Sequence, residues 1–300
     1  MERVWMMRKC LIIGATGLIG RHVVGLLSDN WELYALARKA EELQSHRTHY
    51  IKRDLAEDWN MKGFPESVDA VIHLAQSEHF REFPAHAERI FNVNTISTLR
   101  LLEYARRVKT RIFVLASSGG IYGHGDEGFR EDQAITAKGD LGFYLGTKLC
   151  AEVLAENYTP FINIIILRFF FVYGPGQHSR LLIPRLVKAV KEERPIILHG
   201  KDGLKMNPTY VSDAASAVCR SLELKESQKI NIGGPEILNL KQIGQEIGNV
   251  LHKDPVFEVN EHIQPQHLVG DIQKMVHFLG EPLVKFKEGI ARYIEEEYEK

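Results

Sequence analysis

The chain has 300 residues, of which 44% are hydrophobic and 26% charged, a balance typical of a globular enzyme with one large domain or two small ones. These values exclude disordered, collagen-like and fibrous proteins. The 38 basic and 39 acidic side chains leave a formal charge of −1, so we expect no bulk attraction to nucleic acid or to an anionic membrane.

Short apolar runs rich in Ile, Val and Leu alternate with segments of helical apolar spacing. This alternation predicts an α/β protein with a doubly wound, Rossmann-like parallel sheet covered by helices on both faces. The predicted strands are 10–13, 33–37, 50–52, 70–74, 112–116 and 162–167. Segment 90–108 is predicted to be a helix that packs against the sheet or a partner helix through its apolar positions 90, 93, 96, 99, 101, 102, 105 and 108.

Beyond Tyr173, Gly and Pro residues punctuate shorter elements, which predicts a smaller, irregular α/β lobe for the substrate. We expect a dinucleotide-binding domain over 1–172 plus about 209–240, and the substrate-binding lobe over about 173–208 plus 241–300.

Cys10, Cys150 and Cys219 lack the close pairing of a zinc site and are predicted to be buried thiols in a reducing compartment. The longest apolar stretch, 161–173, is too short to cross a bilayer, and the first ten residues lack the core of a signal peptide. We therefore predict a cytoplasmic protein that binds no membrane.

The strongest local signal is the sequence CLIIGATGLIGRHVVGLLS, in which a strand leads through three glycines into an amphipathic helix. Gly14 permits a tight turn, Gly17 lets the backbone approach a pyrophosphate, and Gly20 permits close packing of the helix. The unpaired N–H groups at the start of that helix suit an anion. This order predicts a dinucleotide site.

The end of the second predicted strand indicates which dinucleotide binds. An acidic residue there would accept from a ribose 2′-hydroxyl, but the chain has Arg38 and Lys39, two cations that suit a 2′-phosphate. NADP is therefore favoured, NAD stays open, and Arg38 is alternatively a solvated charge at a strand end. Asp54 could accept from the adenine amino group or cap a helix.

A serine, a tyrosine and a lysine suggest the chemistry. Ser118 follows the fifth predicted strand, and Tyr144 and Lys148, four residues apart, share one helix face. A phenol with a pKa near 10 is a poor base at neutral pH, but Lys148 and a positively charged nicotinamide would lower its pKa. Ser118 would hold the reacting oxygen while Tyr144 exchanges its proton. Alternatively, Tyr144 packs at an interface.

The motifs GATGLIG, HLA, NVNTISTLRLLE, SSGGIYG, YLGTK, LRFFFVYGPGQ and YVSDAA together resemble the extended short-chain dehydrogenase/reductases, the NAD-dependent epimerase/dehydratase family. The resemblance covers nearly the whole chain. It implies that Ser118, Tyr144 and Lys148 are catalytic, that Asn94 and Arg168 lie near or support the cofactor site, and that the chain forms a homodimer through the helix carrying Tyr144 and the helix around 94–108.

The loop and the resemblance together give two sets of expected binding residues. Those for the cofactor are Gly14, Thr16, Gly17, Leu18, Ile19, Gly20, Arg38, Lys39, Asp54, Leu55, Leu74, Ala75, Asn94, Tyr144 and Lys148. Those for the substrate are Ser118, Gly119, Tyr144, Phe171, His178, Arg180, Lys205 and Met206.

The chain departs from the family pattern in two places. Members that eliminate water from hexoses carry an Asp-Glu pair where this chain has Gly119 and Gly120, which argues against a 4,6-dehydratase. Many members bind a sugar-nucleotide pyrophosphate with an arginine at the place of Met206, so a less charged substrate is also possible. His73, His124, His178 and His199 lack metal-ligand spacing, and we predict no metal site.

We therefore predict an NAD(P)-dependent oxidoreductase or epimerase that transfers hydride at a secondary alcohol or ketone of a sugar or nucleotide sugar. Two alternatives stay open. One is a reductase of a non-sugar ketone, favoured by the apolar run 169–171 unless those Phe side chains are ordinary core. The other is a catalytically silent NADP-binding sensor or scaffold.

Overall fold

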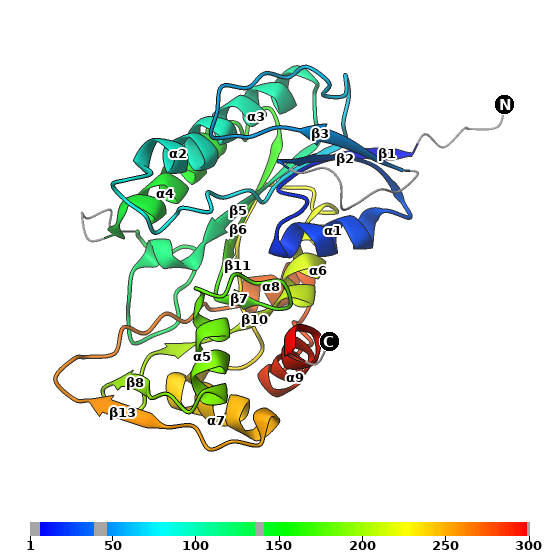
Figure 1. The fold of residues 1–300 in the computed structure, drawn as a ribbon. Helices are drawn as coiled ribbons and strands as arrows, with labels where there is room; N and C mark the ends of the chain where they lie inside the picture. Colours follow the sequence, from blue (N-terminus) through cyan, green and yellow to red (C-terminus); the bar gives the residue numbers. More distant parts are fainter. Residues whose placement is uncertain (1–6, 39–46, 136–140, 299–300) are drawn as a thin grey trace. The chain divides into compact units, whose positions relative to one another are not determined.

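The structure is a computed structural model that describes residues 7–38, 47–135 and 141–298. Its largest sheet has seven strands in the order β11-β6-β5-β4-β1-β2-β3 (Figure 1). The registered pairs β1–β2, β2–β3, β1–β4 and β4–β5 are all parallel. The strands are β1 (Arg8–Ile13), β2 (Trp31–Ala37), β3 (Thr48–Lys52), β4 (Ala70–His73), β5 (Ile112–Ser118), β6 (Asn163–Phe169) and β11 (Gln228–Ile232). The six strands predicted from the sequence and the α/β class are confirmed.

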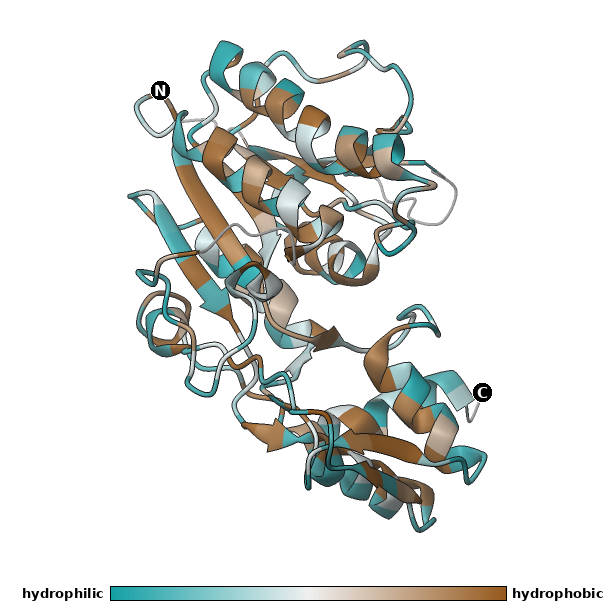
Figure 2. Ribbon diagram, turned by 90° about the vertical axis from the view of Figure 1, so that its left-hand side faces the viewer, coloured by the Kyte–Doolittle hydropathy of each residue, from teal (hydrophilic) through white to brown (hydrophobic). Residues whose placement is uncertain are grey.

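Helices cover both faces of this sheet, as the alternating pattern predicted. The helices α2 (Ala87–Phe91), α3 (Ser97–Arg107) and α4 (Phe143–Glu156) lie on one face, and α1 (Leu18–Leu27) lies on the other (Figure 1). The strands are among the most hydrophobic parts of the chain (Figure 2). One continuous core joins alternate strand residues to α3 and α4, and includes Leu11, Ile13, Val71, Phe113, Leu115, Leu101, Leu102, Ala151 and Ala155.

The predicted helix 90–108 is interrupted by a π-helical turn, Asn92–Ile96, between α2 and α3. Each π turn holds more residues than an α turn, so the residues that follow are rotated about the helix axis. The buried side of this segment therefore includes Asn94 and Ser97, and Leu99 is exposed. Leu99 therefore does not pack against the sheet, and the other predicted arrangement, packing against a partner helix, stays a prediction.

Two of the three cysteines are at least partly buried, and one is exposed. Cys10 is buried and Cys219 partly buried, but Cys150 is exposed because it lies on the side of α4 away from Ala151 and the sheet. The prediction of three buried thiols is therefore wrong for Cys150.

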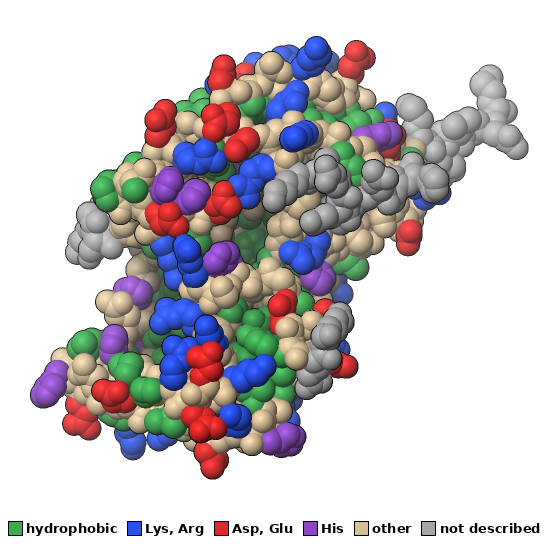
Figure 3. Space-filling model, in the orientation of Figure 1, with side chains coloured by type: hydrophobic (Ala, Val, Ile, Leu, Met, Phe, Trp, Pro, Cys, Tyr) green, Lys and Arg blue, Asp and Glu red, His purple; other side chains and the backbone are tan. Residues whose placement is uncertain are grey.

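Acidic and basic side chains are interspersed on the visible face, in keeping with the near-zero net charge (Figure 3). Within the described part of the chain, every helix is too short or too polar to cross a membrane.

The chain divides into two compact units. Unit 1 comprises 1–121, 137–168 and 215–230, and unit 2 comprises 122–136, 169–214 and 231–300. The domain boundaries predicted from the sequence stay a prediction.

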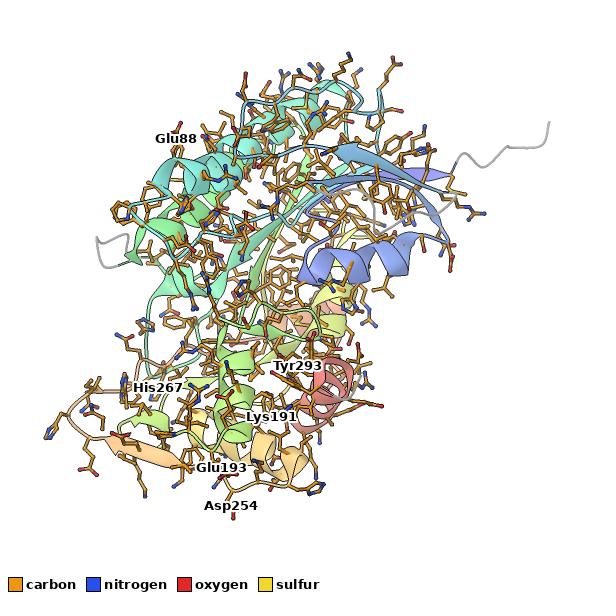
Figure 4. The ribbon with its side chains drawn as sticks, viewed as in Figure 1. Glu88, Lys191, Glu193, Asp254, His267 and Tyr293 are labelled. Atoms are coloured by element: carbon orange, nitrogen blue, oxygen red, sulfur yellow. The ribbon has the colours of Figure 1, made fainter. Side chains whose placement is uncertain are left out.

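Unit 2 is built from short elements, in keeping with its Gly and Pro residues. Three pairs of strands, β10–β7, β12–β9 and β13–β8, accompany its helices. A capping box starts α7, where the Asn239 side chain accepts from the Gln242 N–H and the Gln242 side chain accepts from the Asn239 N–H. At the end of α5, Lys253 Nζ donates to the Lys191 carbonyl and to Glu193. Lys191 and Glu193 are labelled in Figure 4. The elements are β7 (Val172–Tyr173), α5 (Leu182–Lys191), β8 (Ile196–His199), β9 (Lys205–Met206), β10 (Thr209–Tyr210), α6 (Val211–Ser221, shared with unit 1), β12 (Leu238–Asn239), α7 (Leu240–Leu251), β13 (Phe257–Asn260), α8 (Gln273–Leu279) and α9 (Phe286–Tyr298).

Candidate active site

The strand order of unit 1 reverses between the neighbouring strands β1 and β4. In doubly wound sheets, ligands bind at the carboxyl ends of the strands at such a switch point. The Leu74 N–H donates to the Ile13 carbonyl at 2.9 Å, and the Gly14 N–H donates to the Leu36 carbonyl at 3.2 Å. The ends of β1, β2 and β4 therefore meet at the glycine loop.

The loop leaves no room for side chains at two of its glycines. Gly14 has φ +85°, and a Cβ there would lie 2.8 Å from the Ala75 backbone nitrogen. A Cβ on Gly20 would lie 2.0 Å from the Gly14 carbonyl oxygen. The α1 helix starts after Gly17 with no side-chain cap and no acidic residue in its first turn. Thr16, Leu18 and Ile19, on the loop and this first turn, are half-buried. The loop thus presents free N–H groups and a close backbone approach, which fits the pyrophosphate of a dinucleotide.

The strand-end cation is already paired. Arg38 forms a two-pronged ion pair with Glu78, in which Nη2 lies 3.2 Å from Oε2. This pair joins the end of β2 to the segment after β4. Lys39 lies outside the described residues. The predicted preference for NADP therefore stays a prediction.

Asp54 follows β3 and is engaged on both oxygens. Its Oδ1 accepts from the Ala56 N–H at 2.9 Å and its Oδ2 pairs with Arg89 at 3.2 Å. The first bond closes a local turn and caps no helix. Leu55 is buried beside it. A role for Asp54 toward adenine stays a prediction.

The three expected catalytic residues come from β5 and α4. The Gly120 N–H donates to Ser118 Oγ at 3.2 Å, and a Cβ on Gly120 would lie 2.9 Å from a methyl group of Leu145. Lys148, which is buried, donates from Nζ to the Ala116 carbonyl at 3.0 Å. The turn after β5, which includes Gly119, therefore packs against the first turns of α4, where Tyr144 and Lys148 lie one turn apart.

The environment of Tyr144 differs from the one expected. Its hydroxyl donates to Gln76 Oε1 at 2.8 Å, and its ring lies 5.0 Å from the Phe80 ring. Burial raises the pKa of Tyr144, and the positive charge of Arg81 opposes that rise. Burial lowers the pKa of Lys148 to about 8. The expectation that Lys148 and a bound nicotinamide acidify the phenol stays a prediction.

Buried polar contacts hold α4 in place. Asn94, in the π-helical turn, donates to Thr147 Oγ1 at 2.9 Å and accepts from the Ser77 N–H at 3.2 Å. Arg168 of β6 makes a two-pronged pair with Glu152 of α4, with Nη2–Oε2 at 2.7 Å and both side chains 2% exposed. Asn94 thus links the segment after β4 to α4, and Arg168 fixes the same helix one turn after Lys148.

Sequence reasoning missed Gln76, Thr147 and Glu152. Glu152 lies four residues after Lys148, as Lys148 lies four after Tyr144, so helical spacing could have placed it on the same face. Thr147 lies beside that face. The contact of Gln76 with Tyr144 joins residues 68 positions apart, and no local pattern indicates it.

The other expected substrate residues lie in unit 2. His178 and Arg180 are exposed in the loop after β7, where His178 Nδ1 accepts from the Arg180 N–H. Lys205 is exposed on β9, and Phe171 is half-buried with φ 42°. Met206 is fully buried on β9 opposite Leu238. Their role toward a substrate stays a prediction.

His73, at the end of β4, should make folding sensitive to acid. Burial, helped by the charge of Lys148, lowers its pKa to about 3, and its Nδ1 has no hydrogen-bond partner. The unfolded chain binds this proton below its ordinary pKa of about 6.5, whereas the folded chain does not until about pH 3. The free energy of unfolding should therefore fall by about 1 kcal/mol per pH unit below about pH 6.

Urea unfolding at several pH values checks this expectation. His73→Leu should show a shallower loss of stability between about pH 6 and pH 4 than the wild type. The control His49→Leu, at a half-exposed histidine on β3, should keep the wild-type slope. Equal slopes for all three proteins would show that His73 is not buried in its neutral form.

The chain is similar to one protein family and to curated proteins and solved structures of related enzymes. The model of the NAD dependent epimerase/dehydratase family matches residues 10–233. A UDP-glucuronate 4-epimerase of Thermodesulfobacterium geofontis is 28% identical, over 95% of this chain and 94% of its own. The human dTDP-D-glucose 4,6-dehydratase is 24% identical, over 96% and 89%. The crystal structure of UDP-glucuronic acid 4-epimerase from Bacillus cereus, in complex with UDP-glucuronic acid and NAD, has a TM-score of 0.84 at 26% identity, over 96% and 98%.

Proposed function

We propose a function on the basis of the family. The chain belongs to the NAD dependent epimerase/dehydratase family. It is therefore an enzyme that uses a nicotinamide dinucleotide. Within that class, we propose that it inverts a secondary alcohol at C4 of a UDP-sugar. The observation that carries the proposal is the joint placement of Ser118, Tyr144 and Lys148 where β5 ends against α4, in the same unit as the glycine loop.

The glycine loop fits the cofactor that the family implies, because Gly14 and Gly20 leave no space for a side chain and α1 begins with uncapped N–H groups. Gly14, Gly17 and the first turn of α1 would hold the pyrophosphate. When bound, the nicotinamide supplies the exchange of hydride with the sugar carbon.

The side chains of this chain would manage the proton. Tyr144 takes the proton from the sugar hydroxyl through Oη and returns it when the alcohol forms again. Ser118 Oγ holds the same sugar oxygen by a hydrogen bond. Lys148, tied to the Ala116 carbonyl, keeps its positive charge one helical turn from Tyr144 and favours the phenolate. Inversion follows when the carbonyl is reduced on its other face.

Elimination of water from the sugar is not part of the proposal. That reaction needs an acid and a base in addition to the tyrosine, and Gly119 and Gly120 carry no side-chain acid or base. The human relative at 24% identity is named as a dehydratase, so the lack of a side-chain acid or base at Gly119 and Gly120 is the basis of the distinction.

The substrate class rests on relatives, and the cofactor choice is left to experiment. One relative is named as a UDP-glucuronate 4-epimerase, and the Bacillus cereus structure holds UDP-glucuronic acid and NAD. Arg38, the cation on which a preference for NADP depends, is already in an ion pair with Glu78. The predicted homodimer would use the outer side of α3 and α4, where Leu99 and Val153 are exposed.

The test incubates purified enzyme with UDP-glucose, UDP-glucuronic acid, UDP-N-acetylglucosamine and dTDP-glucose, each with NAD or NADP. Products are identified by proton NMR, and the absorbance of the reduced nicotinamide is followed. We expect the C4 epimer of a UDP-sugar with no net change in reduced cofactor. Net formation of reduced cofactor would identify an oxidoreductase that releases its ketone product, and a 4-keto-6-deoxy product a dehydratase. Either result, or no turnover across the panel, contradicts the proposal.

A further inference from the structure

Two histidines and a glutamate converge on the segment between β4 and α2. His79 Nδ1 lies 2.9 Å and His86 Nε2 lies 3.3 Å from the same oxygen of Glu82, Oε2. The two imidazole rings stack at 4.0 Å with 17° between their planes. One ligand atom from each of the three residues lies within 4.8 Å of the others. On the visible face, histidine side chains lie beside an acidic one close to α2 (Figure 3).

The backbone places these side chains together independently of their mutual contact. The Glu82 N–H donates to the His79 carbonyl at 2.8 Å, and the His86 N–H donates to the Glu82 carbonyl at 3.0 Å. These turns bring positions 79, 82 and 86 to one side of the segment. Glu88, in the first turn of α2, is exposed and points away from the molecule (Figure 4), so it does not belong to the cluster.

The separations match those of metal ligands. Imidazole nitrogen and carboxylate oxygen bind Zn²⁺ at about 2.0–2.1 Å, so two such ligands at a tetrahedral angle lie about 3.3 Å apart. The separations of 2.9 Å, at present a hydrogen bond, and 3.3 Å are close to that value. One of the two stacked rings would turn about its Cβ–Cγ bond so that both nitrogens face one ion. Two His and one Glu also form a known zinc ligand set, in which water takes the fourth position. The three side chains are 29%, 38% and 35% exposed, which leaves room for that water.

A second carboxylate, that of Glu78, lies near the other ring nitrogen of His79. His79 Nε2, the nitrogen that faces away from Glu82, lies 3.6 Å from Glu78 Oε1. A metal-bound histidine usually donates its other N–H to a carboxylate, which fixes the ring and strengthens the ligand. Glu78 is itself held by Arg38.

We propose that His79, Glu82 and His86 form a binding site for a divalent metal ion of the zinc class. Glu78 is the outer partner of His79. The site lies on the segment that carries Gln76 and Phe80, both of which contact Tyr144, so a bound ion would fix that segment beside α4. The proposal does not depend on the proposed function, because its test measures metal binding alone.

Isothermal titration of the full chain without a polyhistidine tag, freed of metal by a chelator, is the direct test. Zn²⁺ is titrated in the presence of excess Mg²⁺, which prefers oxygen ligands. We expect one equivalent to bind. His79→Ala and His86→Ala should each weaken binding at least tenfold, and Glu78→Gln should weaken it by about 10-fold to 100-fold.

Matched controls separate this site from ordinary surface binding. His49→Ala removes a histidine that lies 3.3 Å from a single carboxylate, Glu32, and should leave zinc binding unchanged. Cys150→Ser removes the exposed thiol and should also leave it unchanged. Circular dichroism establishes that each variant is folded. The proposal is overturned if folded His79→Ala and His86→Ala bind Zn²⁺ like the wild type, if the controls lose as much affinity, or if the wild type binds no equivalent.

Discussion

Replacing Tyr144 by phenylalanine should lower kcat by about 10²-fold to 10⁴-fold, the range typical of losing a general acid–base group. The ring and its packing against Phe80 are kept. Only the hydroxyl, which donates a hydrogen bond to Gln76, is removed. Binding of the dinucleotide should change little, because the glycine loop is untouched. Turnover of the identified substrate and cofactor binding by fluorescence titration are the two measurements.

Tyr158→Phe is the matched control for this variant. Tyr158 also donates its hydroxyl to a side chain, Glu103, but it lies at the end of α4 and away from Ser118. It should keep the wild-type kcat. If Tyr144→Phe retains more than about a tenth of kcat, the phenol is not the acid–base group. A protein whose biological output survives Tyr144→Phe would instead fit the sensor or scaffold alternative.

Breaking the Arg168–Glu152 pair should lower the free energy of unfolding more than the other substitutions proposed for this protein. Glu152→Gln removes the carboxylate charge from the two-pronged pair with the Arg168 guanidinium, at a site where both side chains are 2% exposed. Removing one partner of a buried pair typically costs about 3–5 kcal/mol. Equilibrium unfolding in urea should show this loss as a lower midpoint. Because the pair positions α4, kcat should fall in the same variant.

The double variant Glu152→Leu with Arg168→Met tests whether the charge left unpaired is the cause. Replacing both partners with apolar residues of similar size is often neutral or stabilising, so the double variant should be more stable than Glu152→Gln. Glu192→Gln, in an exposed ion-pair cluster with Lys188 and Arg194, should unfold like the wild type. A Glu152→Gln protein as stable as the wild type would contradict this account.

The parts of the fold that sequence reasoning predicted are those fixed by neighbouring residues. The six strands were found because fully buried parallel strands form continuous apolar runs, as at Ile112–Ser118. The glycine loop was found because the spacing of Gly14, Gly17 and Gly20 follows directly from the turn between a strand and a helix. Tyr144 and Lys148 share a face because four residues make about one helical turn.

Sequence reasoning did not predict burial where distant neighbours decide it. Leu99 is exposed because its side of α3 does not face the sheet, and only a second chain could cover it there. Cys150 is exposed because α4 turns that side away from its sheet. The histidines weighed from the sequence did not include His79 and His86, although their spacing about Glu82 is visible there.

The sequence by itself determined the family, the class of fold, and the placing of a glycine loop and a Tyr-Lys helix in chain order. These features depend on residues a few positions apart, so the pattern of the sequence is enough to predict them. Only the tertiary structure decided that Arg38 pairs with Glu78, that Tyr144 donates to Gln76, and that Arg168 is buried against Glu152. Those pairs join separate elements of a parallel sheet and its covering helices, and each contact exists only after the strands have aligned.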